Sequence, residues 1–328
     1  MSAKTMKAAT RGDYGPTESV GVTDVATPEV DDDGLLVRVR AASVNPYDWH
    51  IVTGMPYIAR IASGLRRPKS ALLGADFAGT VEAVGARVTE FRSGDEVFGV
   101  GAGAFAECIS VRADGAVAAK PANLTFEEAA AVPLAGITAL QGLRDKGRLQ
   151  PGQRVLINGA SGGVGTFAVQ IARALGAEVT AVCSSRNIQQ ASALGAAPVI
   201  DYTRQDFTRS AERFEVLLDI GGNRSWSACK RVLVERGVLV PVGGPKTNRF
   251  VGVLGRRLVG RLASVGQSRS SVLFLAHMNK DDLNALRELL EAGSVTPVIE
   301  RRFPLDEVPE ALGYVGAGHA RGKVVITV

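Results

Sequence analysis

Residues 155–186 constrain the fold more than any other stretch, and they read VLINGASGGVGTFAVQIARALGAEVTAVCSSR. The β-branched run at 155–157 predicts a strand that is covered on both faces. After the glycines, apolar residues recur at helical spacing over residues 166–175, and Gly176 ends the run, so a helix is expected there. Residues 178–183 predict a second strand. A strand, a glycine turn, a helix and a strand in this order form the βαβ unit of a dinucleotide-binding domain.

The glycine turn is predicted to hold the pyrophosphate of the dinucleotide. The pattern G-x-G-x-x-G occurs with alanine in the first place, as Ala160, Gly162 and Gly165. Glycines at such a turn let the backbone approach the phosphates, whose charge meets the N–H groups at the start of the helix. A purely structural turn is the alternative, but the flanking strands and helix favour the dinucleotide. The residues expected to face the pyrophosphate are Ser161, Gly162, Gly163 and Val164.

The end of the second strand bears on which nicotinamide cofactor the domain takes. An acid about 20 residues after the glycines would bind the ribose 2′-hydroxyl of NADH and repel a 2′-phosphate. This sequence has Ser184, Ser185 and Arg186 there instead. Two hydroxyls and a guanidinium suit a phosphate, so NADPH is expected in preference to NADH. The alternative is that Arg186 points into water and binds nothing.

The 328 residues are enough for two domains, and the pattern of the sequence changes along the chain. Short alternating runs between glycine and aspartate turns predict a small β-rich barrel in the first 120 residues. From residue 155, strands alternate with helices, and six strands predict a doubly wound parallel α/β sheet whose last strand lies at 271–276. Residues 126–143 are expected to form a helix. The β-rich tail is expected to rejoin the barrel. The predicted parts are residues 1–123 and 279–328 for the discontinuous barrel domain, and 124–278 for the nucleotide-binding domain.

Composition and charge argue against several other classes of protein. Apolar residues make up 46% of the chain and charged residues 22%, which is typical of a globular protein. The 38 basic and 33 acidic residues give a mixed surface without a nucleic-acid motif, so no nucleic-acid partner is expected. Three widely spaced cysteines predict neither a disulfide framework nor a structural zinc. No run approaches 18 apolar residues and no apolar leader opens the sequence, so we expect a cytoplasmic protein with no membrane insertion.

Eight short motifs are spread along almost the whole chain. They are SVNPYD at 43–48, LGADFAG at 73–79, GDEV at 94–97, AVPLAGITA at 131–139, the turn at 158–165, PVIE at 297–300, VPEA at 308–311 and GHARGK at 318–323. Together these motifs resemble the medium-chain dehydrogenase/reductase superfamily, and specifically its zinc-free quinone oxidoreductase branch. The last three, in the tail, look like the reticulon-interacting subgroup of that branch. The resemblance implies a Rossmann domain joined to a GroES-like domain.

The resemblance also locates the positions at which zinc-dependent relatives hold their metal. Those relatives place two cysteines and a histidine where this chain has Asn45, Leu134 and Ala75. An amide, an isobutyl group and a methyl group cannot replace thiolates and an imidazole around zinc, so no metal is expected. Without a Lewis acid, hydrogen-bond donors must meet the charge on the acceptor, which favours conjugated acceptors. The expected reaction is hydride transfer from NADPH to a small hydrophobic quinone or α,β-unsaturated carbonyl compound.

The resemblance implies further residues for the pocket and for the cofactor. Asn45 occupies a family position beside the nicotinamide, and Tyr47 and Tyr57 are candidate hydrogen-bond donors. Each has a structural alternative of about equal weight: holding a turn, packing as an aromatic ring, or decorating a loop. The remaining residues implied at the cofactor are Thr138 and Phe274 near the nicotinamide, Tyr202 at the adenine-ribose end, Gly221 and Gly243 at strand ends, and His319 and Arg321 in the tail.

Three functions remain open at this point, because function does not follow from the fold alone. The first is an NADPH-dependent reductase of quinones or activated alkenes, and the second is a zinc-free carbonyl/alcohol oxidoreductase. The third is an NADPH-binding interaction or structural protein with little turnover. A homodimer is the expected assembly. Residues 53–72 show little pattern, and loops of this length are usually functional or disordered.

Overall fold

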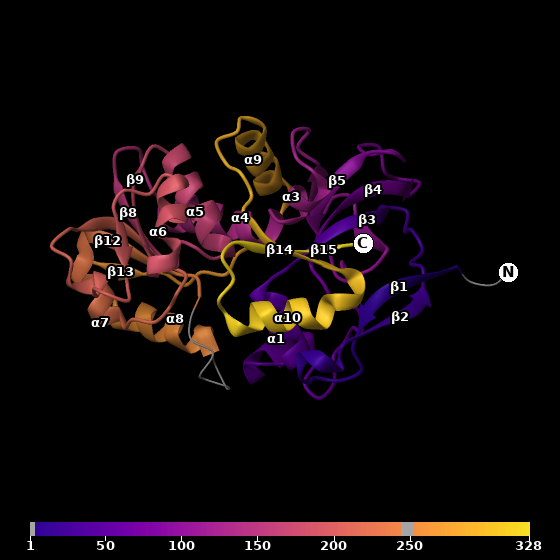
Figure 1. The fold of residues 1–328 in the computed structure, drawn as a ribbon, viewed down its shortest axis with the longest axis horizontal. Helices are drawn as coiled ribbons and strands as arrows, with labels where there is room; N and C mark the ends of the chain where they lie inside the picture. The colour runs from indigo at the N-terminus through magenta and orange to yellow at the C-terminus, as the bar shows by residue number, and fades with distance from the viewer. Residues whose placement is uncertain (1–3, 244–251) are drawn as a thin grey trace. The chain divides into compact units, whose positions relative to one another are not determined.

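The computed structural model describes residues 4–243 and 252–328, and the chain divides into two compact units (Figure 1). The first unit comprises Met1–Ile137, Met278–Ala292 and Pro297–Val328, and the second comprises Thr138–His277 and Gly293–Thr296. The sequence instead suggests a first boundary after residue 123. The observed boundary lies further along because helix α3 (Phe126–Ala130) packs against strands β3 (Gly34–Val44) and β4 (Asp76–Val84) of the first unit.

The second unit is built on a six-stranded parallel sheet with the strand order β10-β9-β8-β11-β12-β13. The strands are β8 (Arg154–Asn158), β9 (Glu178–Cys183), β10 (Val199–Asp201), β11 (Phe214–Asp219), β12 (Leu233–Pro241) and β13 (Ser270–Ser271). The helices are α5 (Gly163–Ala174), α6 (Ile188–Ala193), α7 (Trp226–Cys229) and α8 (Gly252–Ala263). Successive strands are added on both sides of β8, first β9 and β10 on one side and then β11, β12 and β13 on the other. This is the doubly wound Rossmann arrangement that the sequence predicts.

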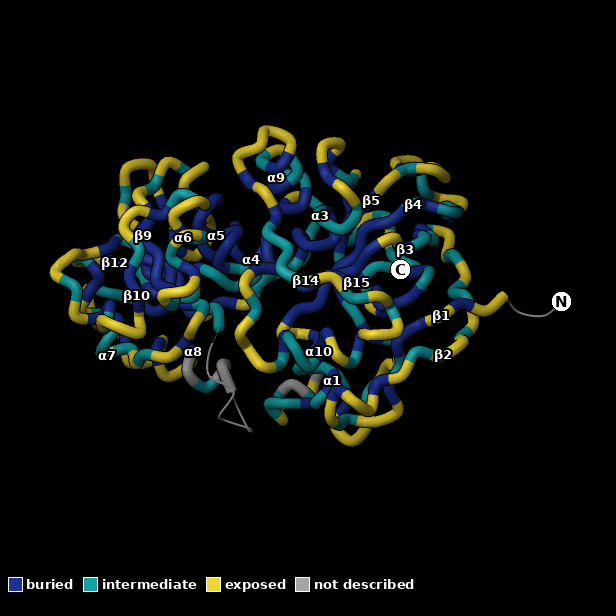
Figure 2. The backbone as a smooth tube through the Cα atoms, in the orientation of Figure 1, coloured by how far each residue is buried: buried dark blue, intermediate teal, exposed yellow. Residues whose placement is uncertain are grey.

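The central strand of this sheet is buried for the reason that its sequence indicates. Val155, Leu156 and Ile157 are fully buried, as expected for a parallel strand that is covered on both faces. Figure 2 shows buried backbone at the neighbouring strand β9 as well. Helix α5 packs against β8 and β9, and its Phe167 and Ile171 are also fully buried. The βαβ unit therefore forms a rigid base for the turn at residues 159–162.

The sixth strand is shorter than predicted. The sequence predicts a strand over 271–276, whereas β13 covers only Ser270–Ser271. Among the strands of the described residues, β13 lies at the edge of the sheet with β12 as its one neighbour, and a further bond runs from Val272 N to Leu239 O at 3.0 Å. Beyond it, Leu273 and Leu275 are exposed. The residues that the structure describes leave these two leucine side chains of the predicted strand uncovered.

The first unit is β-rich and contains a seven-stranded sheet and a two-stranded ribbon. The sheet has the order β14-β15-β3-β4-β5-β7, with β6 also paired to β3, and the ribbon is β1-β2. The remaining strands are β1 (Thr5–Thr10), β2 (Gly21–Ala26), β5 (Glu96–Val100), β6 (Cys108–Arg112), β7 (Val117–Ala119), β14 (Ile299–Pro304) and β15 (Lys323–Thr327). Strand β15 pairs antiparallel with β3, with Val325 beside Ser43. The tail therefore returns to this domain, as the sequence predicts.

The predicted helix at 126–143 is divided. The chain forms α3, then α4 (Pro133–Gln141), then a π-helical turn at Gly142–Lys146. Pro133 explains the break, because it has no N–H to continue the first helix and disfavours helical backbone in the residue before it. The first unit also contains α1 (Pro46–Thr53), α2 (Arg60–Ser63), α9 (Lys280–Glu291) and α10 (Val308–Ala317). None of the helices that the structure describes is long and apolar enough to cross a membrane.

The segment at 53–72 is more ordered than its sequence pattern indicates. It contains a 3-10 turn at Tyr57–Ala59 followed by α2. The Tyr14 hydroxyl lies 2.8 Å from Ser63 Oγ and donates to Gly64 O at 2.7 Å. The guanidinium of Arg60 lies 4.3 Å from the centre of the Tyr14 ring. Contacts with a residue distant in sequence therefore fix this segment, and local periodicity carries no signal of them.

Candidate functional site

The glycine turn between β8 and α5 leaves its outer side open. Gly159 has a φ of +89°, which residues with side chains rarely adopt. A Cβ on Gly165 would lie 2.2 Å from the Gly159 carbonyl oxygen, so this glycine lets the helix pack closely on the turn. A Cβ on Gly162 would meet no atom nearer than 3.8 Å. The protein does not fill the space at Gly162, and the turn fits a group that approaches its backbone from outside, as a pyrophosphate does.

Helix α5 begins at this turn with donors that the helix itself cannot satisfy. Its N-cap residue, Gly162, has extended backbone and no side-chain cap. Thr166 N donates to Gly162 O at 2.9 Å, which is the first bond of the helix. The first N–H groups of a helix have no intrahelical acceptor, and the aligned peptide dipoles make that end positive. The N–H groups of Gly163, Val164 and Gly165 are therefore suited to an anion.

Two of the predicted serines meet at a third residue, Asn187. The Asn187 Nδ2 lies 3.0 Å from Ser161 Oγ in the turn and 3.2 Å from Ser184 Oγ, which directly follows β9. Asn187 is only 5% exposed. The sequence pattern did not reveal it, because a polar residue just before α6 is typical of a helix cap. The structure joins the turn and the end of β9 through this one amide.

Ser185 is already engaged within the protein. Its hydroxyl donates to Asp201 Oδ2, and the same carboxylate accepts hydrogen bonds from Thr203 N at 2.9 Å and Thr203 Oγ1 at 2.7 Å. These bonds, that from Ser185 first, lower the pKa of Asp201 below its ordinary value. The sequence shows no acid at the end of β9, but parallel pairing places Asp201 of β10 beside Cys183. Of Ser184 and Ser185, only Ser184 keeps a hydroxyl proton that is free to be donated.

Arg186 and Tyr202 lie on the exposed side of the same strand ends. Arg186 is exposed and has no hydrogen-bond or ion-pair partner among the residues that the structure describes. Tyr202 is half exposed, and its N–H donates to Cys183 O at 3.0 Å. Arg204 lies 3.6 Å from Asp201 and offsets part of that charge. Arg186 is thus a cation that is not paired within the described protein, next to Ser184.

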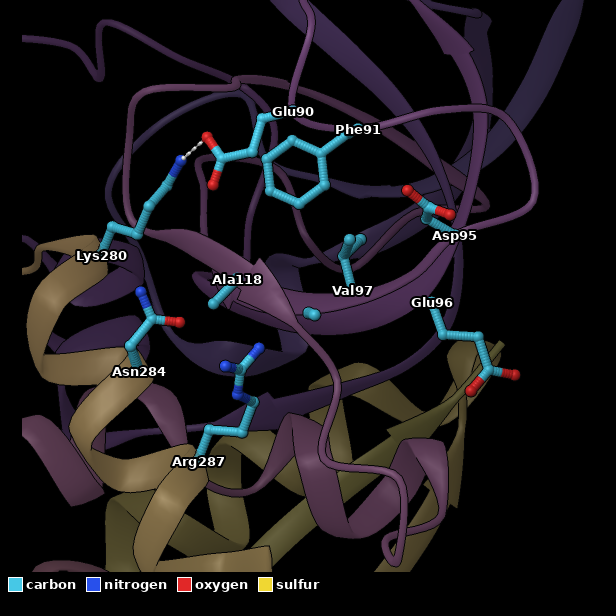
Figure 3. A pocket seen from close by; sticks show the side chains of 10 residues that line it. Glu90, Phe91, Asp95, Glu96, Val97, Ala118, Lys280, Asn284 and Arg287 are labelled. Atoms are coloured by element: carbon cyan, nitrogen blue, oxygen red, sulfur yellow. Dashed lines mark hydrogen bonds and ion pairs between the residues drawn. The ribbon is translucent and has the colours of Figure 1, made fainter.

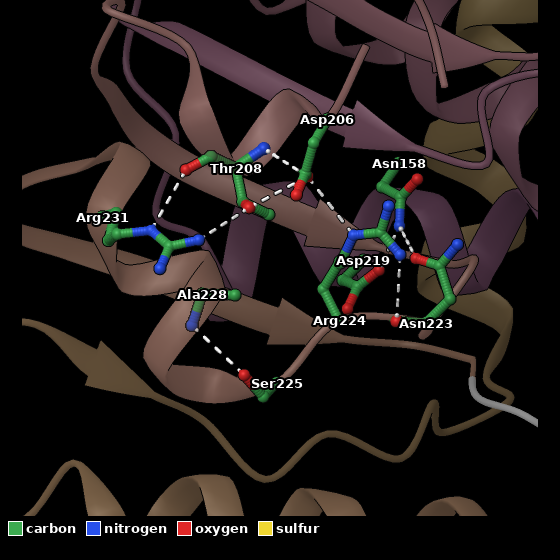
Figure 4. Close-up of polar contacts among 9 residues, drawn as sticks. All are labelled: Asn158, Asp206, Thr208, Asp219, Asn223, Arg224, Ser225, Ala228 and Arg231. Carbon is green, nitrogen blue, oxygen red and sulfur yellow. Dashed lines mark hydrogen bonds and ion pairs between the residues drawn. The ribbon is translucent and has the colours of Figure 1, made fainter. Parts of the chain in front are cut away.

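A network of hydrogen bonds holds the loop after β11 beside the glycine turn (Figure 4). Asn158 Nδ2 donates to Asp219 Oδ1 at 2.7 Å and to Asn223 Oδ1 at 3.3 Å. Gly222 N donates to the same Asp219 oxygen at 2.9 Å. The Gly221 N–H donates to Asn158 O at 3.0 Å. These bonds place Gly221, a predicted cofactor residue, at the carboxyl edge of the sheet, where ligands bind in such folds.

The charged side chains next to these residues bind other residues of the protein. Asp206 accepts hydrogen bonds from Thr208 N at 3.1 Å and from Arg224 Nε at 3.3 Å. Arg231 donates to Thr208 O at 3.3 Å and to Thr208 Oγ1 at 3.1 Å. Figure 4 shows these side chains turned toward one another. Arg224 and Arg231 are therefore engaged within the protein, unlike a side chain that is available to a phosphate.

Three other predicted cofactor residues are explained by close packing. A Cβ on Gly243 would lie 2.0 Å from Ile220 O, so this glycine allows the ends of β11 and β12 to approach. Phe274 is fully buried, and a Cβ on Gly142 would lie 3.5 Å from its ring. Thr138 is also buried. In the described structure, Phe274 is a core residue of the second unit, and its ring is covered by protein.

In the first unit, Asn45 belongs to a buried polar cluster. Its Nδ2 donates to Asp76 Oδ2 at 2.9 Å and to Ser43 O at 3.3 Å. Its Oδ1 accepts a hydrogen bond from Lys323 Nζ at 2.6 Å. Asp76 also accepts from Ser43 Oγ at 2.9 Å and from Leu134 N at 3.0 Å. Both N–H donors of the Asn45 amide are used within the protein, so none is left for a substrate. The arrangement fits a structural role for Asn45, holding the turn, better than direct contact with a substrate.

Burial dominates the electrostatics of this cluster. Lys323 lies 3.5 Å from Asp76 Oδ2, and both side chains are almost fully buried. Burial raises the pKa of Asp76, which the Lys323 ammonium opposes, and lowers the pKa of Lys323, which the Asp76 carboxylate opposes. Burial raises the pKa of Asp48, whose Oδ2 accepts from Asn45 N at 2.7 Å, to about 7. Two carboxyl groups and one ammonium share the site, and Asp48 titrates near neutral pH.

Tyr47 and Tyr57 occupy different surroundings. Tyr47 lies in the first turn of α1 and is 51% exposed. Burial of its other side and then the nearby Asp48 raise the pKa of the Tyr47 phenol above its ordinary value. Tyr57 is 42% exposed, with the Arg60 guanidinium 4.8 Å from its ring centre. His50 Nδ1 lies 2.6 Å from Met55 O, a contact that fixes the loop after α1.

The two predicted tail residues lie between α10 and β15. His319 is exposed. Arg321 donates through its backbone N to Glu300 Oε2 at 2.6 Å and through Nε to Glu300 Oε1 at 3.3 Å. The Glu300 carboxylate neutralises the Arg321 charge, whereas the His319 side chain makes no hydrogen bond or ion pair with the residues that the structure describes.

A cavity of about 360 Å³ in the first unit lies outside both groups of residues (Figure 3). It is bordered by α9 and by the strands β5 and β7. Its acids are largely paired with cations: Glu90 lies 2.8 Å from Lys280, and Glu96 lies 3.1 Å from Lys120. The cavity contains none of the predicted site residues. Among the described residues, no three or more histidine, cysteine, aspartate or glutamate side chains are placed to hold a metal ion.

Comparison with known proteins assigns the family. The family described as alcohol dehydrogenase GroES-like domain matches residues 31–122, and the family described as zinc-binding dehydrogenase matches residues 194–326. The mitochondrial NAD(P)H oxidoreductase RTN4IP1 of Mus musculus is 35% identical over 90% of this chain and 81% of that protein. The chain belongs to the medium-chain dehydrogenase/reductase superfamily.

Two further similarities extend over nearly the whole of this dehydrogenase/reductase. The 2-methylene-furan-3-one reductase of Solanum lycopersicum is 32% identical, over 98% of this chain and 79% of that protein. The solved structure of the quinone oxidoreductase from Coxiella burnetii is 31% identical, with a TM-score of 0.84 over 99% of this chain and 100% of that one. The Rossmann and GroES-like domains are thus those of the superfamily, and the protein is an oxidoreductase.

Proposed function

We propose that this protein is an NADPH-dependent, zinc-independent reductase that transfers hydride to quinones or α,β-unsaturated carbonyl compounds. The observation that carries the proposal is the buried ammonium of Lys323, 2.6 Å from Asn45 Oδ1. By resemblance, Asn45 stands where zinc-dependent relatives have a cysteine ligand. A buried ammonium repels a divalent cation, and the amide supplies no thiolate to offset that repulsion. A site without a Lewis acid favours acceptors that spread the developing negative charge by conjugation.

The names of the relatives support this class of reaction. They include an NAD(P)H oxidoreductase and a quinone oxidoreductase. A third relative is named a 2-methylene-furan-3-one reductase, and such a furanone is an α,β-unsaturated ketone. Quinones and enones share a carbonyl conjugated to a carbon–carbon double bond. We extend that shared chemistry to this chain.

The second unit provides the residues to hold the cofactor. The open space at Gly162 and the first N–H groups of α5 suit the pyrophosphate. Ser184 and Arg186, which pairs with none of the described residues, suit a 2′-phosphate, while Ser185 is turned to Asp201. When bound, the reduced nicotinamide supplies the hydride. NADPH is preferred in this proposal because Ser184 and Arg186 both offer donors to a phosphate.

Tyr47 is the proposed proton donor. After hydride addition, a conjugated acceptor needs one proton, on oxygen for a quinone or on carbon for an enone. The half-exposed Tyr47 phenol keeps its proton at neutral pH, as a tyrosine ordinarily does, and burial raises its pKa further. Asp48, next in the chain, is fixed by the Asn45 backbone N–H at 2.7 Å and anchors the first turn of α1. Asn45 therefore contributes by positioning α1, and Tyr47 by donating.

The test is consumption of NADPH by the purified protein with a panel of quinones, enones and simple ketones. We expect turnover with quinones or enones and none with simple ketones. Turnover with simple ketones would support a carbonyl/alcohol oxidoreductase instead. Tight NADPH binding with no turnover on any acceptor would support a binding or structural protein. Loss of activity after dialysis against a chelator, restored by zinc, would contradict the zinc-independent mechanism.

The cofactor preference has a separate test in Arg186→Ala. Removing a guanidinium that contacts a phosphate costs about 1.5–3 kcal/mol, so the NADPH Kd should rise roughly 10-fold to 100-fold. The NADH Kd should stay within about twofold, because NADH has no 2′-phosphate. Arg209→Ala is a matched control, since Arg209 is also exposed in the second unit. Equal losses for both cofactors would remove the phosphate assignment.

We also propose that the protein is a homodimer. Leu273 and Leu275 are exposed while Phe274 between them is buried, the alternation of an extended segment at the open edge of the sheet beside β13. A second copy of the same edge covers such a row. Analytical ultracentrifugation should show a dimer that Leu275→Asp converts to monomer, whereas Leu65→Asp, at an exposed leucine of the first unit, should not. A monomeric wild-type protein would overturn the proposal.

A further inference from the structure

Asn187 is a buried amide that satisfies two serine hydroxyls at once. Its Nδ2 lies 3.0 Å from Ser161 Oγ and 3.2 Å from Ser184 Oγ. Its Oδ1 is buried and has no hydrogen-bond partner among the described residues. The reverse orientation of the amide would bury two unpaired N–H donors in place of one unpaired oxygen. The observed orientation is therefore the favourable one, and Asn187 acts as the donor to both serines.

This orientation determines what the two hydroxyls offer to a ligand. A serine hydroxyl has one O–H donor and two acceptor lone pairs. Asn187 occupies an acceptor position on Ser161 and on Ser184, and neither hydroxyl makes another hydrogen bond among the described residues. Both serines are partly exposed. Each one keeps its proton free to donate outward. Ser185 shows the opposite case, because its proton goes to Asp201.

We propose that Asn187 is the positioning residue for the phosphates of the dinucleotide, since it turns Ser161 and Ser184 into hydrogen-bond donors toward the cofactor. The proposal rests on the proposed function and deepens its cofactor site. Ser161 lies in the turn that suits the pyrophosphate, and Ser184 lies at the strand end that suits the 2′-phosphate. Asn187 touches neither phosphate. It fixes the direction of both donors and links the turn to the end of β9.

The decisive variant is Asn187→Asp, which keeps the shape of the side chain and reverses its hydrogen-bonding character. The carboxylate accepts the protons of both serines, so their lone pairs face the phosphates, and a negative charge is added nearby. We expect the NADPH Kd, measured by calorimetry or by quenching of tryptophan fluorescence, to rise about 100-fold. Asn187→Ala, which leaves the serine protons free to rotate, should raise it only about threefold to tenfold. Asn123→Asp, an exposed asparagine in the first unit, is the matched control and should leave the Kd unchanged.

A double-mutant cycle separates this role from a merely structural one. In a Ser161→Ala/Ser184→Ala background, only the charge of Asn187→Asp can act, so its effect on the NADPH Kd should fall to about tenfold. An unchanged factor in the two backgrounds would overturn the proposal, because Asn187 would then not act through the serines. Ser184→Ala alone should weaken NADPH more than NADH, and Ser161→Ala should weaken both equally.

Two controls keep the outcomes distinct. Circular dichroism and melting of each variant check the fold, and if Asn187→Asp does not fold, the same cycle is run with Asn187→Ala. Failure of the wild-type protein to bind any nicotinamide dinucleotide would contradict the proposed function itself. Tight wild-type binding that is insensitive to Asn187→Asp would contradict only this inference.

Discussion

Replacing Lys323 with methionine tests whether a buried ammonium balances the carboxyl groups of the first unit. Methionine is unbranched and apolar, so the change mainly removes the charge and its donors. In the native protein, Lys323 Nζ lies 2.6 Å from Asn45 Oδ1 and 3.5 Å from Asp76 Oδ2, with both ends of the ion pair almost fully buried. In Lys323→Met, Asp76 keeps its hydrogen bonds from Ser43, Asn45 and the Leu134 N–H but loses the one cation that pairs with it among the described residues.

The size of the loss follows from what remains around Asp76. Removing one partner of a buried ion pair typically costs about 3–5 kcal/mol of unfolding free energy. The remaining hydrogen bonds to the carboxylate place the expected loss near the lower end, about 3 kcal/mol. For a domain of roughly 150–250 residues, that corresponds to a fall in Tm of about 6–12 °C. The chain has two tryptophans, and Trp49 lies in the first unit. Urea unfolding followed by Trp49 fluorescence, in a Trp226→Phe background, measures the change.

Two companion variants show whether charge balance is the cause. Asp76→Asn in the Lys323→Met protein removes the unbalanced carboxylate, so it should restore part of the lost stability. Lys7→Met breaks an exposed pair in which Lys7 Nζ lies 3.1 Å from Asp24, and it should cost less than about 1 kcal/mol. The reasoning is refuted if Lys323→Met costs no more than Lys7→Met, or if Asp76→Asn adds a further independent loss to it.

Three other predictions follow from the same structure. Gly165→Ala should prevent stable folding of the second unit, because the added Cβ would lie 2.2 Å from a backbone oxygen. Gly162→Ala should leave Tm within about 3 °C of the wild-type value but weaken NADPH binding at least tenfold. Melting curves and calorimetry measure the two effects, and equal Tm values for the two variants would contradict this prediction. The pKa of Asp48 is raised in the folded protein to about 7, so the folded state holds that proton more tightly than the unfolded state does. The free energy of unfolding should therefore fall as pH rises from about 4 to about 7. Asp48→Asn should flatten this pH dependence in urea titrations, and an unchanged slope in the variant would contradict the role of Asp48. Tyr47→Phe should lower kcat at least tenfold and leave the NADPH Kd unchanged in stopped-flow assays, whereas an unaffected kcat would exclude Tyr47 as the proton donor.

The sequence predicts those parts of the molecule that depend on local spacing. The βαβ unit was accessible because a short β-branched run, a glycine turn and a helical period lie within one continuous stretch, and each obeys a local steric rule. The discontinuous barrel domain was accessible because the tail changes back to a β pattern. The break at Pro133 was also locally encoded, although the apolar run around it suggested a continuous helix.

The remaining features depend on partners that no local pattern reveals. Asn45 is placed by an ammonium 278 residues away in the sequence, so its amide looked free for the pocket until the two chain segments were seen to pair. The acid that engages Ser185 comes from β10, the neighbouring strand, rather than from the end of β9. Asn187 stands just before α6, and its two serine partners come from the glycine turn and from the end of β9. Each of these depends on strand pairing, which decides the neighbours across a sheet but leaves no periodic signal in either strand alone.

The return of β15 to the sheet of the first unit also sets an order of assembly. Strand β15 lies between β14 and β3, and it brings Lys323 to carboxyl groups that belong to the first 80 residues. Ribosomes make the whole of residues 138–277 before this strand exists. Until β15 is made, the β-rich segment of the first unit has an open sheet edge and carboxyl groups that lack this cation, whereas the last strand of the second unit, β13, ends at Ser271. The second unit can therefore form its sheet before Lys323 completes the charge balance of the first unit.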